Sequence, residues 1–269
     1  MSEEPIRTNV GWALHGDNLF RGRSVAGDLD GKTTSWSALC LGLGHRTLTA
    51  EETTFLDDLA VAITAADPRI WPLKVAWLVG CYGSSFAAMA AAHQFLADAG
   101  MGPAVASSVG KLWRDLDAEL AVAPNLRDGL VSFIARRKAA GDLPPGFGLV
   151  PGRPRDERIA LIDGVVRRHD RTTYRFYALM RRAAPILEQS CGMQVNLMGA
   201  LSACLLDLGL TVEQLGPTAC VAMSPTLWAN AFESARLKPR QLQCLPLATV
   251  HYVGPTERPA PSRGHRGGM

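Results

Sequence analysis

Apolar side chains along this chain recur mainly at helical spacing. Segments that alternate apolar and polar residues, as a half-buried strand would, are almost absent, whereas Ala, Leu, Arg and Glu fill long stretches. The segment from Thr49 to Glu52 has the capping-box pattern that begins a helix. After it, one helix face is expected to carry Phe55, Leu56, Leu59 and Ile63. The pattern therefore predicts a nearly all-α protein.

The same spacing predicts a series of further helices, separated by glycine- and proline-containing segments. They are expected over residues 71–97, 105–120, 126–140, 156–169, 173–191, 195–208, 211–224 and 226–237. Small residues dominate 71–97, so this helix is expected to be central and to approach its neighbours closely. Pro225 is expected to divide the last two helices, because proline cannot donate a backbone hydrogen bond. Residues 255–269, rich in Pro, Arg and Gly, are expected to be disordered.

Composition narrows the range of functions. With 269 residues, of which 47% are apolar, the chain can bury a substantial core. The chain has 28 Lys plus Arg and 25 Asp plus Glu, so its net charge is small. No strong electrostatic field therefore favours nucleic acid or a membrane as partner. Apolar stretches end well before the roughly 20 residues that a bilayer span needs. Six cysteines without a Cys-x-x-Cys pair, and no secretory leader, predict a reducing, cytoplasmic location.

Two regions of the chain resemble a known family. Gly146 to Val150 reads Gly-Phe-Gly-Leu-Val and is followed by Asp156-Glu157-Arg158, which resembles the citrate synthase signature Gly-Phe-Gly-His-Arg with its later Asp-Pro-Arg. Val195 to Gly199 is similar to the Asn-Val-Asp-Gly segment of citryl-CoA lyase and of the C-terminal module of ATP-citrate lyase. Shorter matches in the same order occur at 18–24, 66–67 and 251–253.

The resemblance implies an all-α, citrate-synthase-like fold. It implies a large helical domain formed by 1–102 and 197–254, with a small helical domain, 103–196, inserted between them. In that family the substrate cleft lies at the domain boundary and a second subunit completes it, so the resemblance also implies a homodimer.

The resemblance also shows which chemistry the chain lacks. In the family, an aspartate removes a proton from the methyl group of acetyl-CoA, one histidine hydrogen-bonds the developing enolate, and a second histidine serves the partner carbonyl. The corresponding positions here are Met198 for the aspartate and Gly102 and Leu149 for the histidines. Pro68 stands where a substrate-binding histidine is implied. The family's carboxylate-binding arginines map onto Met223 or Pro225 and onto the neighbourhood of Cys244 and Leu245. Because carboxylates in a partly dry site need such partners, citrate, oxaloacetate and citryl-CoA are not expected to be the natural substrates.

Several residues remain candidates for a site. Arg158 matches a family ligand and suits a carboxylate, although it can equally pair with Asp156 or Glu157 at a helix start. Asp156, Asn196 and Asn230 are candidate proton handlers; the two amides can instead bind backbone groups.

A second group of candidates concerns the cofactor. Gly146, Phe147 and Gly148 match the family loop around the adenine of CoA, so CoA or an acyl-CoA is the expected ligand. No histidine pair has metal-ligand spacing, so no metal is expected.

Other motifs are interpreted as structural. Gly44-His45-Arg46 imitates a family motif but precedes the capping box, where a turn is expected. Cys81 is interpreted as a small core residue, because His93 is too far along the same predicted helix to act as its base. The basic stretch from Arg167 to Arg182 is interpreted as a solvated helix face.

Two functions stay open at this point. The first is an enzyme, a carbon-carbon lyase or acyltransferase, that acts on an acyl-CoA or a related carboxylate by altered chemistry. The second is a non-catalytic binding or structural subunit of a larger assembly.

Overall fold

The computed structural model describes residues 6–255 except 66, 99, 124, 142–145, 150–154, 243 and 245. The chain forms two compact units, residues 1–239 and 240–269. In the second unit a short 3-10 turn covers Leu247–Thr249. The predicted disordered segment, 255–269, lies outside the described residues except for Pro255. The division into large and small helical domains stays a prediction.

Helices make up most of the first unit, and the all-α prediction is confirmed. The helices are α1 (Ser35–Gly42), α2 (Ala50–Ala62), α3 (Trp71–Tyr82), α4 (Ser85–Asp98), α5 (Ala106–Leu120), α6 (Leu126–Ala139), α7 (Arg158–Arg168), α8 (Arg175–Cys191), α9 (Leu197–Asp207) and α10 (Val212–Leu237). Two short turns of other helix types also occur: Val25–Leu29 precedes α1, and Gly102–Val105 (η2) joins α4 to α5.

A small antiparallel sheet near the start of the chain was not predicted. Its strands are β1 (Gly11–Leu14), β2 (Asp17–Phe20) and β3 (Arg23–Ser24), in that spatial order, with Gly11 opposite Phe20. Arg21 donates two hydrogen bonds to the carbonyl oxygen of Gly42, at 3.0 and 2.6 Å. These bonds attach the sheet to the end of α1.

Local sequence signals account for several helix ends. The Thr49 hydroxyl accepts a hydrogen bond from the Glu52 backbone, and the Glu52 carboxylate accepts one from the Thr49 backbone at 2.9 Å, so the predicted capping box is confirmed. Gly192 ends α8 in the left-handed conformation, with φ of 63°. The Asp207 carboxylate accepts from the backbone N–H groups of Phe176 and Tyr177, both at 2.8 Å, and so links α9 to the first turn of α8.

The single helix predicted over 71–97 is wrong, because the chain breaks between α3 and α4. Gly83 is extended, with φ of −130° and ψ of −155°, and ends α3. The Ser84 hydroxyl then accepts a hydrogen bond from the Ala87 backbone at 3.1 Å, as a helix-capping serine does.

The predicted division at Pro225 is also wrong, because α10 continues through both Pro217 and Pro225. Each half of the helix buries its own apolar face, and that burial outweighs the one hydrogen bond that a proline removes. Hydroxyls beside Pro225 also bind helix carbonyls, Ser224 that of Cys220 and Thr226 that of Met223, each at 2.8 Å.

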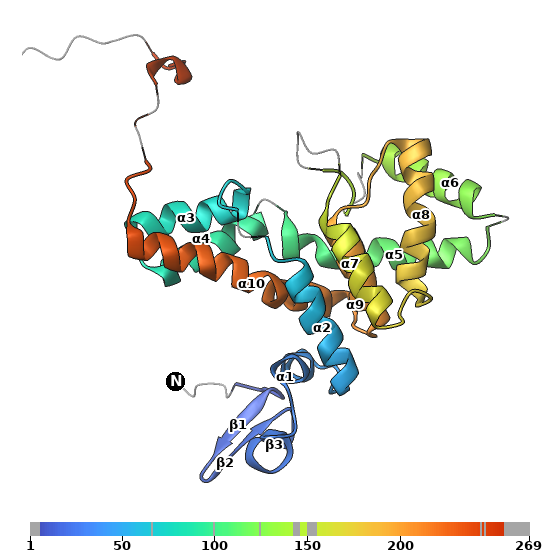
Figure 1. Cartoon of the computed structure of the whole chain (residues 1–269), viewed down its shortest axis with the longest axis horizontal. Helices are drawn as coiled ribbons and strands as arrows, with labels where there is room; N and C mark the ends of the chain where they lie inside the picture. Colours follow the sequence, from blue (N-terminus) through green and yellow to red (C-terminus); the bar gives the residue numbers. More distant parts are fainter. Residues whose placement is uncertain are drawn as a thin grey trace, which may run out of the picture. The chain divides into compact units, whose positions relative to one another are not determined.

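Among the described residues of the first unit, the buried apolar side chains form two clusters. The larger cluster packs α5, α8 and α9 around Trp113 and receives the first half of α10. The smaller cluster joins α3 and α4 to the second half of α10. Figure 1 shows α10 alongside α3 and α4. A β-carbon on Gly80 would lie 1.9 Å from the Ser234 hydroxyl, so there is no room for one. Helices α3 and α10 therefore approach closely at this glycine, as the small residues of 71–97 predicted.

Within the described ranges, no single helix has the length and apolar character needed to cross a membrane. Helices α9 and α10, taken together as a pair bent by 118°, do meet that requirement by length and composition.

Candidate functional site

The loop that resembles the CoA-binding segment lies against the start of α9. Phe147 and Val195 form an isolated antiparallel bridge. The Gly148 N–H donates to the carbonyl of Gln194 at 2.8 Å, and the Asn196 N–H donates to the carbonyl of Gly146 at 3.0 Å. Two segments nearly fifty residues apart, both selected by the family resemblance, are therefore in direct contact.

Two glycines allow this contact. Gly146 has a φ of 85°, and a β-carbon there would lie 2.9 Å from a methyl group of Val109. A β-carbon on Gly199 would lie 2.6 Å from the carbonyl oxygen of Gly146. The Trp113 indole donates to the carbonyl of Gly199 at 2.9 Å, and its ring contacts Phe147 edge to face with the centroids 5.7 Å apart. The loop therefore has little room to move on the α9 side.

Asp156 and Arg158 form an ion pair beside the loop. The Arg158 Nε and Nη2 atoms each lie 2.8 Å from a carboxylate oxygen of Asp156. The same carboxylate accepts the backbone N–H of Leu197 at 2.9 Å. Burial alone would raise the pKa of Asp156, but the hydrogen bond and charge of Arg158 outweigh it, helped by the Leu197 N–H, and hold the pKa below its usual value. The pairing of Arg158 with Asp156 is thus observed, and the role of Arg158 as a ligand for a carboxylate stays a prediction.

Asn196 caps α9. Its Oδ1 accepts the backbone N–H groups of Met198 and Gly199, at 3.0 and 3.2 Å, and its Nδ2 donates to the carbonyl of Gly148 at 3.2 Å. Together, Asp156 and Asn196 bind the first three N–H groups of α9. Both side chains therefore stabilise this helix start, and their role in proton handling stays a prediction.

Asn230 lies apart from these residues. It is 4% exposed on α10, between Leu227 and Ala231 of the smaller cluster, and its Nδ2 donates to the carbonyl of Thr226 at 2.9 Å. A surface hollow of about 350 Å³ is lined by Pro68, Ala229, Asn230, Phe232, Glu233 and Arg236. Pro68, where the resemblance implies a substrate-binding histidine, therefore shares this hollow with Asn230.

Two of the three positions implied for proton transfer, Met198 and Gly102, have apolar neighbours. Met198 is 5% exposed in the larger cluster, and Leu149 is half-buried next to the loop. Gly102 has a φ of 54°, and a β-carbon there would lie 3.1 Å from Leu96 and 3.8 Å from Met223. The hollow described above and a second one, of about 470 Å³ beside β1 and β2, are lined by none of the three.

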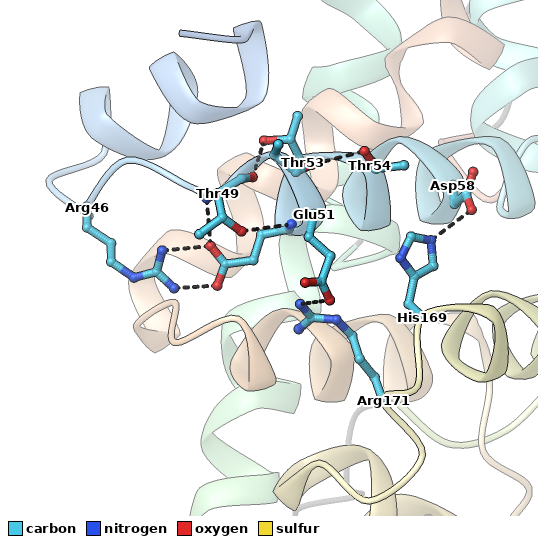
Figure 2. A network of polar contacts seen from close by, with 10 residues as sticks. Arg46, Thr49, Glu51, Thr53, Thr54, Asp58, His169 and Arg171 are labelled. Carbon is cyan, nitrogen blue, oxygen red and sulfur yellow. Dashed lines mark hydrogen bonds and ion pairs between the residues drawn. The ribbon is translucent and has the colours of Figure 1, made fainter. Parts of the chain in front are cut away.

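A second polar network joins α2 to the connection between α7 and α8 (Figure 2). Arg46 pairs with Glu52 through two hydrogen bonds of 2.7 and 2.5 Å, so this arginine is structural, as interpreted. Asp58 contacts the Nε2 atom of His169 at 2.9 Å and Arg168 at 3.3 Å.

Arg171 lies 3.6 Å from Glu51 in the same network, and the solvated-face interpretation is wrong for this arginine. It is 5% exposed, and its guanidinium lies over the rings of Phe55 and Tyr174, at 4.7 and 4.8 Å from their centroids.

One pair of reactive side chains was missed by the sequence analysis. The Cys220 sulfur on α10 lies 3.4 Å from Nδ1 of His93 on α4. Cys81, the cysteine considered from the sequence, is buried in α3, in accord with a core role. No local signal connects residues 93 and 220, because only packing of the two helices brings them together. In the part of the chain that is described, no three His, Cys, Asp or Glu side chains gather closely enough to hold a metal ion.

No family model and no curated protein sequence matches the chain. Among solved structures, it is similar to citryl-CoA lyase from Hydrogenobacter thermophilus, with a TM-score of 0.74 and 15% identity over 96% of this chain and 98% of that one. It is also similar to ATP citrate lyase from Methanothrix soehngenii in complex with citrate and coenzyme A, with a TM-score of 0.73 and 15% identity, where the match spans 96% of this chain and 43% of that one.

A third similar structure is citrate synthase from Thermoplasma acidophilum with carboxymethyl coenzyme A and oxaloacetate. Its TM-score is 0.59 and its identity 17%, over 84% of this chain and 58% of that one. The three likenesses agree with one another and with the observed helices. The chain therefore has the citrate-synthase-like fold.

Proposed function

We propose that this protein binds an acyl-CoA or a related carboxylate and acts on it by chemistry other than Claisen condensation or its reverse. The observation that carries the proposal is a contrast within one region. The loop from Gly146 to Gly148 is held in a fixed geometry, whereas the adjacent Leu149 and Met198 have no group that transfers protons.

The loop retains polar backbone groups that suit a base such as adenine. In its bridge with Val195, the hydrogen bonds come from the neighbours Gly146 and Gly148. The N–H and C=O groups of Phe147 itself therefore point to the opposite edge, away from α9. A donor and an acceptor side by side match the edge of a purine. Two structures similar to this one contain CoA or a CoA derivative, which supports the same ligand class here.

The carboxylate that such a site takes is expected to be small. Arg158 already satisfies Asp156, and separating that pair would leave a buried charge without a partner. Citrate has three carboxylates, and each needs a positive or donating group in a partly dry site. A thioester with one carboxylate or none makes fewer such demands.

A second candidate function is a non-catalytic subunit. It is favoured by the fact that Asp156, Arg158 and Asn196 bind one another and the backbone of α9. Groups used in this way stabilise the fold and need no substrate to explain them.

We also propose a homodimer formed through α3, α4 and α10. Trp71, Phe86 and Phe232 on these helices are 62%, 75% and 64% exposed, and Phe86 stacks edge to face on Trp228. Aromatic surface of this kind is typical of protein interfaces.

The binding proposal is tested by thermal unfolding with CoA, acetyl-CoA, malate and pyruvate. A ligand at about 100 times its Kd is expected to stabilise the native state by about 2.7 kcal/mol, seen as a higher Tm. Gly148→Ala is expected to weaken the effect of CoA, because Gly148 has a φ of 91° and any side chain there strains the loop.

Gly192→Ala is the matched control. Gly192 also has a positive φ, 63°, and like Gly148 has no atom within 4 Å of its built β-carbon, but it lies at the end of α8. The control should lose some stability and keep the full response to CoA. If no thioester or carboxylate raises the Tm of the unaltered protein, the binding proposal is wrong and the non-catalytic subunit is the better account.

A further inference from the structure

Cys220 and His93 form a contact between a thiol and an imidazole. The 3.4 Å between Sγ and Nδ1 is within hydrogen-bonding range for sulfur. Both side chains are half-buried, so they are neither sealed in the core nor fully in solvent. A thiol within reach of a base is the arrangement of a nucleophile that acts in acyl transfer.

The pair lies next to a position that the family resemblance marks. Cys220 is three residues before Met223 on α10, and His93 is three residues before Leu96 on α4. Residues three apart are neighbours on a helix surface. Met223 and Leu96 are the side chains closest to Gly102, the position implied for the first catalytic histidine. The thiol and the imidazole therefore each lie about one helical turn from a residue whose side chain reaches Gly102.

We propose that Cys220 and His93 are a nucleophile and its base, and that Cys220 accepts an acyl group from a thioester. The nature of the donor rests on the proposed function above. In the reaction, the Cys220 sulfur forms a bond to the carbonyl carbon of the thioester, and His93 Nδ1 takes the thiol proton. The carbonyl carbon–sulfur bond to CoA then breaks, and the CoA thiolate takes the proton from His93. The products are S-acyl-Cys220 and free CoA, with no oxidant or reductant consumed.

The surroundings of Cys220 make the imidazole necessary. Burial raises the pKa of the Cys220 thiol. The thiol is therefore protonated near neutral pH, and attack requires removal of its proton.

The other cysteines offer internal controls. Cys40, Cys81 and Cys204 are buried, whereas Cys244 is exposed in the second unit. Cys244 should be acetylated at the same rate whether position 93 is His or another residue.

The test is acetylation at pH 7, located by mass spectrometry of peptides, with p-nitrophenyl acetate and with acetyl-CoA as donors. Both donors are expected to acetylate Cys220, and Cys220→Ala, which has no nucleophile, should show no acetylation at this position. His93→Gln is expected to slow acetylation of Cys220 roughly tenfold or more while leaving Cys244 unchanged. A circular dichroism melt checks that each variant is folded, and His93→Asn serves if His93→Gln is not.

The two donors separate two kinds of failure. Equal rates at Cys220 with and without His93, using p-nitrophenyl acetate, would overturn the nucleophile–base assignment. Acetylation from p-nitrophenyl acetate that depends on His93, together with none from acetyl-CoA at concentrations that raise the Tm, would overturn the thioester as donor. If acetyl-CoA, CoA, malate and pyruvate all failed to raise the Tm, the proposed function would be wrong, while acetylation from p-nitrophenyl acetate that depends on His93 would still support the nucleophile–base pair.

Discussion

Two polar regions of this molecule use the same residue types in opposite ways. At the start of α9, the Asp156 side chain is 5% exposed and its oxygens bind backbone N–H groups as well as Arg158. Along α2, the pair of Asp58 and Arg168 is more exposed, with Asp58 at 37% and Arg168 at 60%. Water competes little for the first set and strongly for the second. The comparison shows that a charged side chain near a candidate site can stabilise the fold instead of binding a ligand. It also shows that the number of ion pairs alone is a poor guide to the free energy of unfolding.

The largest expected effect concerns Asp156. Asp156→Ala should destabilise the protein by about 3 kcal/mol, because Arg158 and the first turn of α9 lose their partner in a buried setting. Urea unfolding measures the change. Glu157→Gln, at the neighbouring exposed position, keeps the size and hydrogen-bonding capacity of the side chain and should cost under about 0.5 kcal/mol, which makes it a control. A loss below about 1 kcal/mol for Asp156→Ala would mean that Arg158 does not depend on this carboxylate and is available to a ligand.

An intermediate effect is expected for Glu52, which is in the α2 network but is only 13% exposed. The hydrogen bond from Arg46 lowers the pKa of Glu52 from 4.5 to about 2. A carboxyl whose pKa is lower in the folded state stabilises the protein above its unfolded pKa, near 4.5, and that stability is lost as the pH falls toward 2.

Because Arg46 is half-exposed, the stabilisation at stake is about 1 kcal/mol rather than the full value of the shift. Wild type should therefore lose roughly 0.6 kcal/mol more than Glu52→Gln when urea unfolding is compared at about pH 6 and about pH 3, because only part of the pKa shift lies above pH 3. Parallel losses in the two proteins would show that the pair with Arg46 contributes nothing.

The smallest effect is expected at Arg168, whose Nη2 lies 3.3 Å from Asp58 at the surface. Arg168→Ala should change the free energy of unfolding by at most about 0.5 kcal/mol, and added salt should reduce even that difference. Urea unfolding of wild type and Arg168→Ala at low and high ionic strength measures this difference and its dependence on salt. A salt-independent loss above about 1 kcal/mol would show that this contact, and not apolar packing, holds α2 against α7.

The sequence was most informative where a signal is local. The capping box at Thr49 depends on a few consecutive residues, and it was confirmed. The break after Gly83 and the persistence of α10 through Pro225 were missed, because each depends on what neighbouring helices bury. Propensity is a weak guide where tertiary packing decides.

Some features of the candidate site were likewise predicted from the sequence and others were not. Resemblance selected the loop at Gly146 and the start of α9, and the structure brings them together. The separate position of Asn230 and the contact between Cys220 and His93 were not predicted, since both depend on how α10 packs against α4 and the smaller cluster. A spacing of 127 residues leaves no periodic trace in a sequence.

The continuity of α10 affects how the first unit can come apart. A helix of 26 residues extends for about 39 Å, and this one belongs to the larger cluster as far as Ala222 and to the smaller cluster from Leu227 onward. Because α10 contributes side chains to both clusters, unfolding of one cluster removes contacts from the other. The two clusters should therefore unfold together in one cooperative transition. Pro225, which cannot donate to the carbonyl four residues earlier, lies where one core gives way to the other. If the two clusters unfold separately, α10 should open first at Pro225.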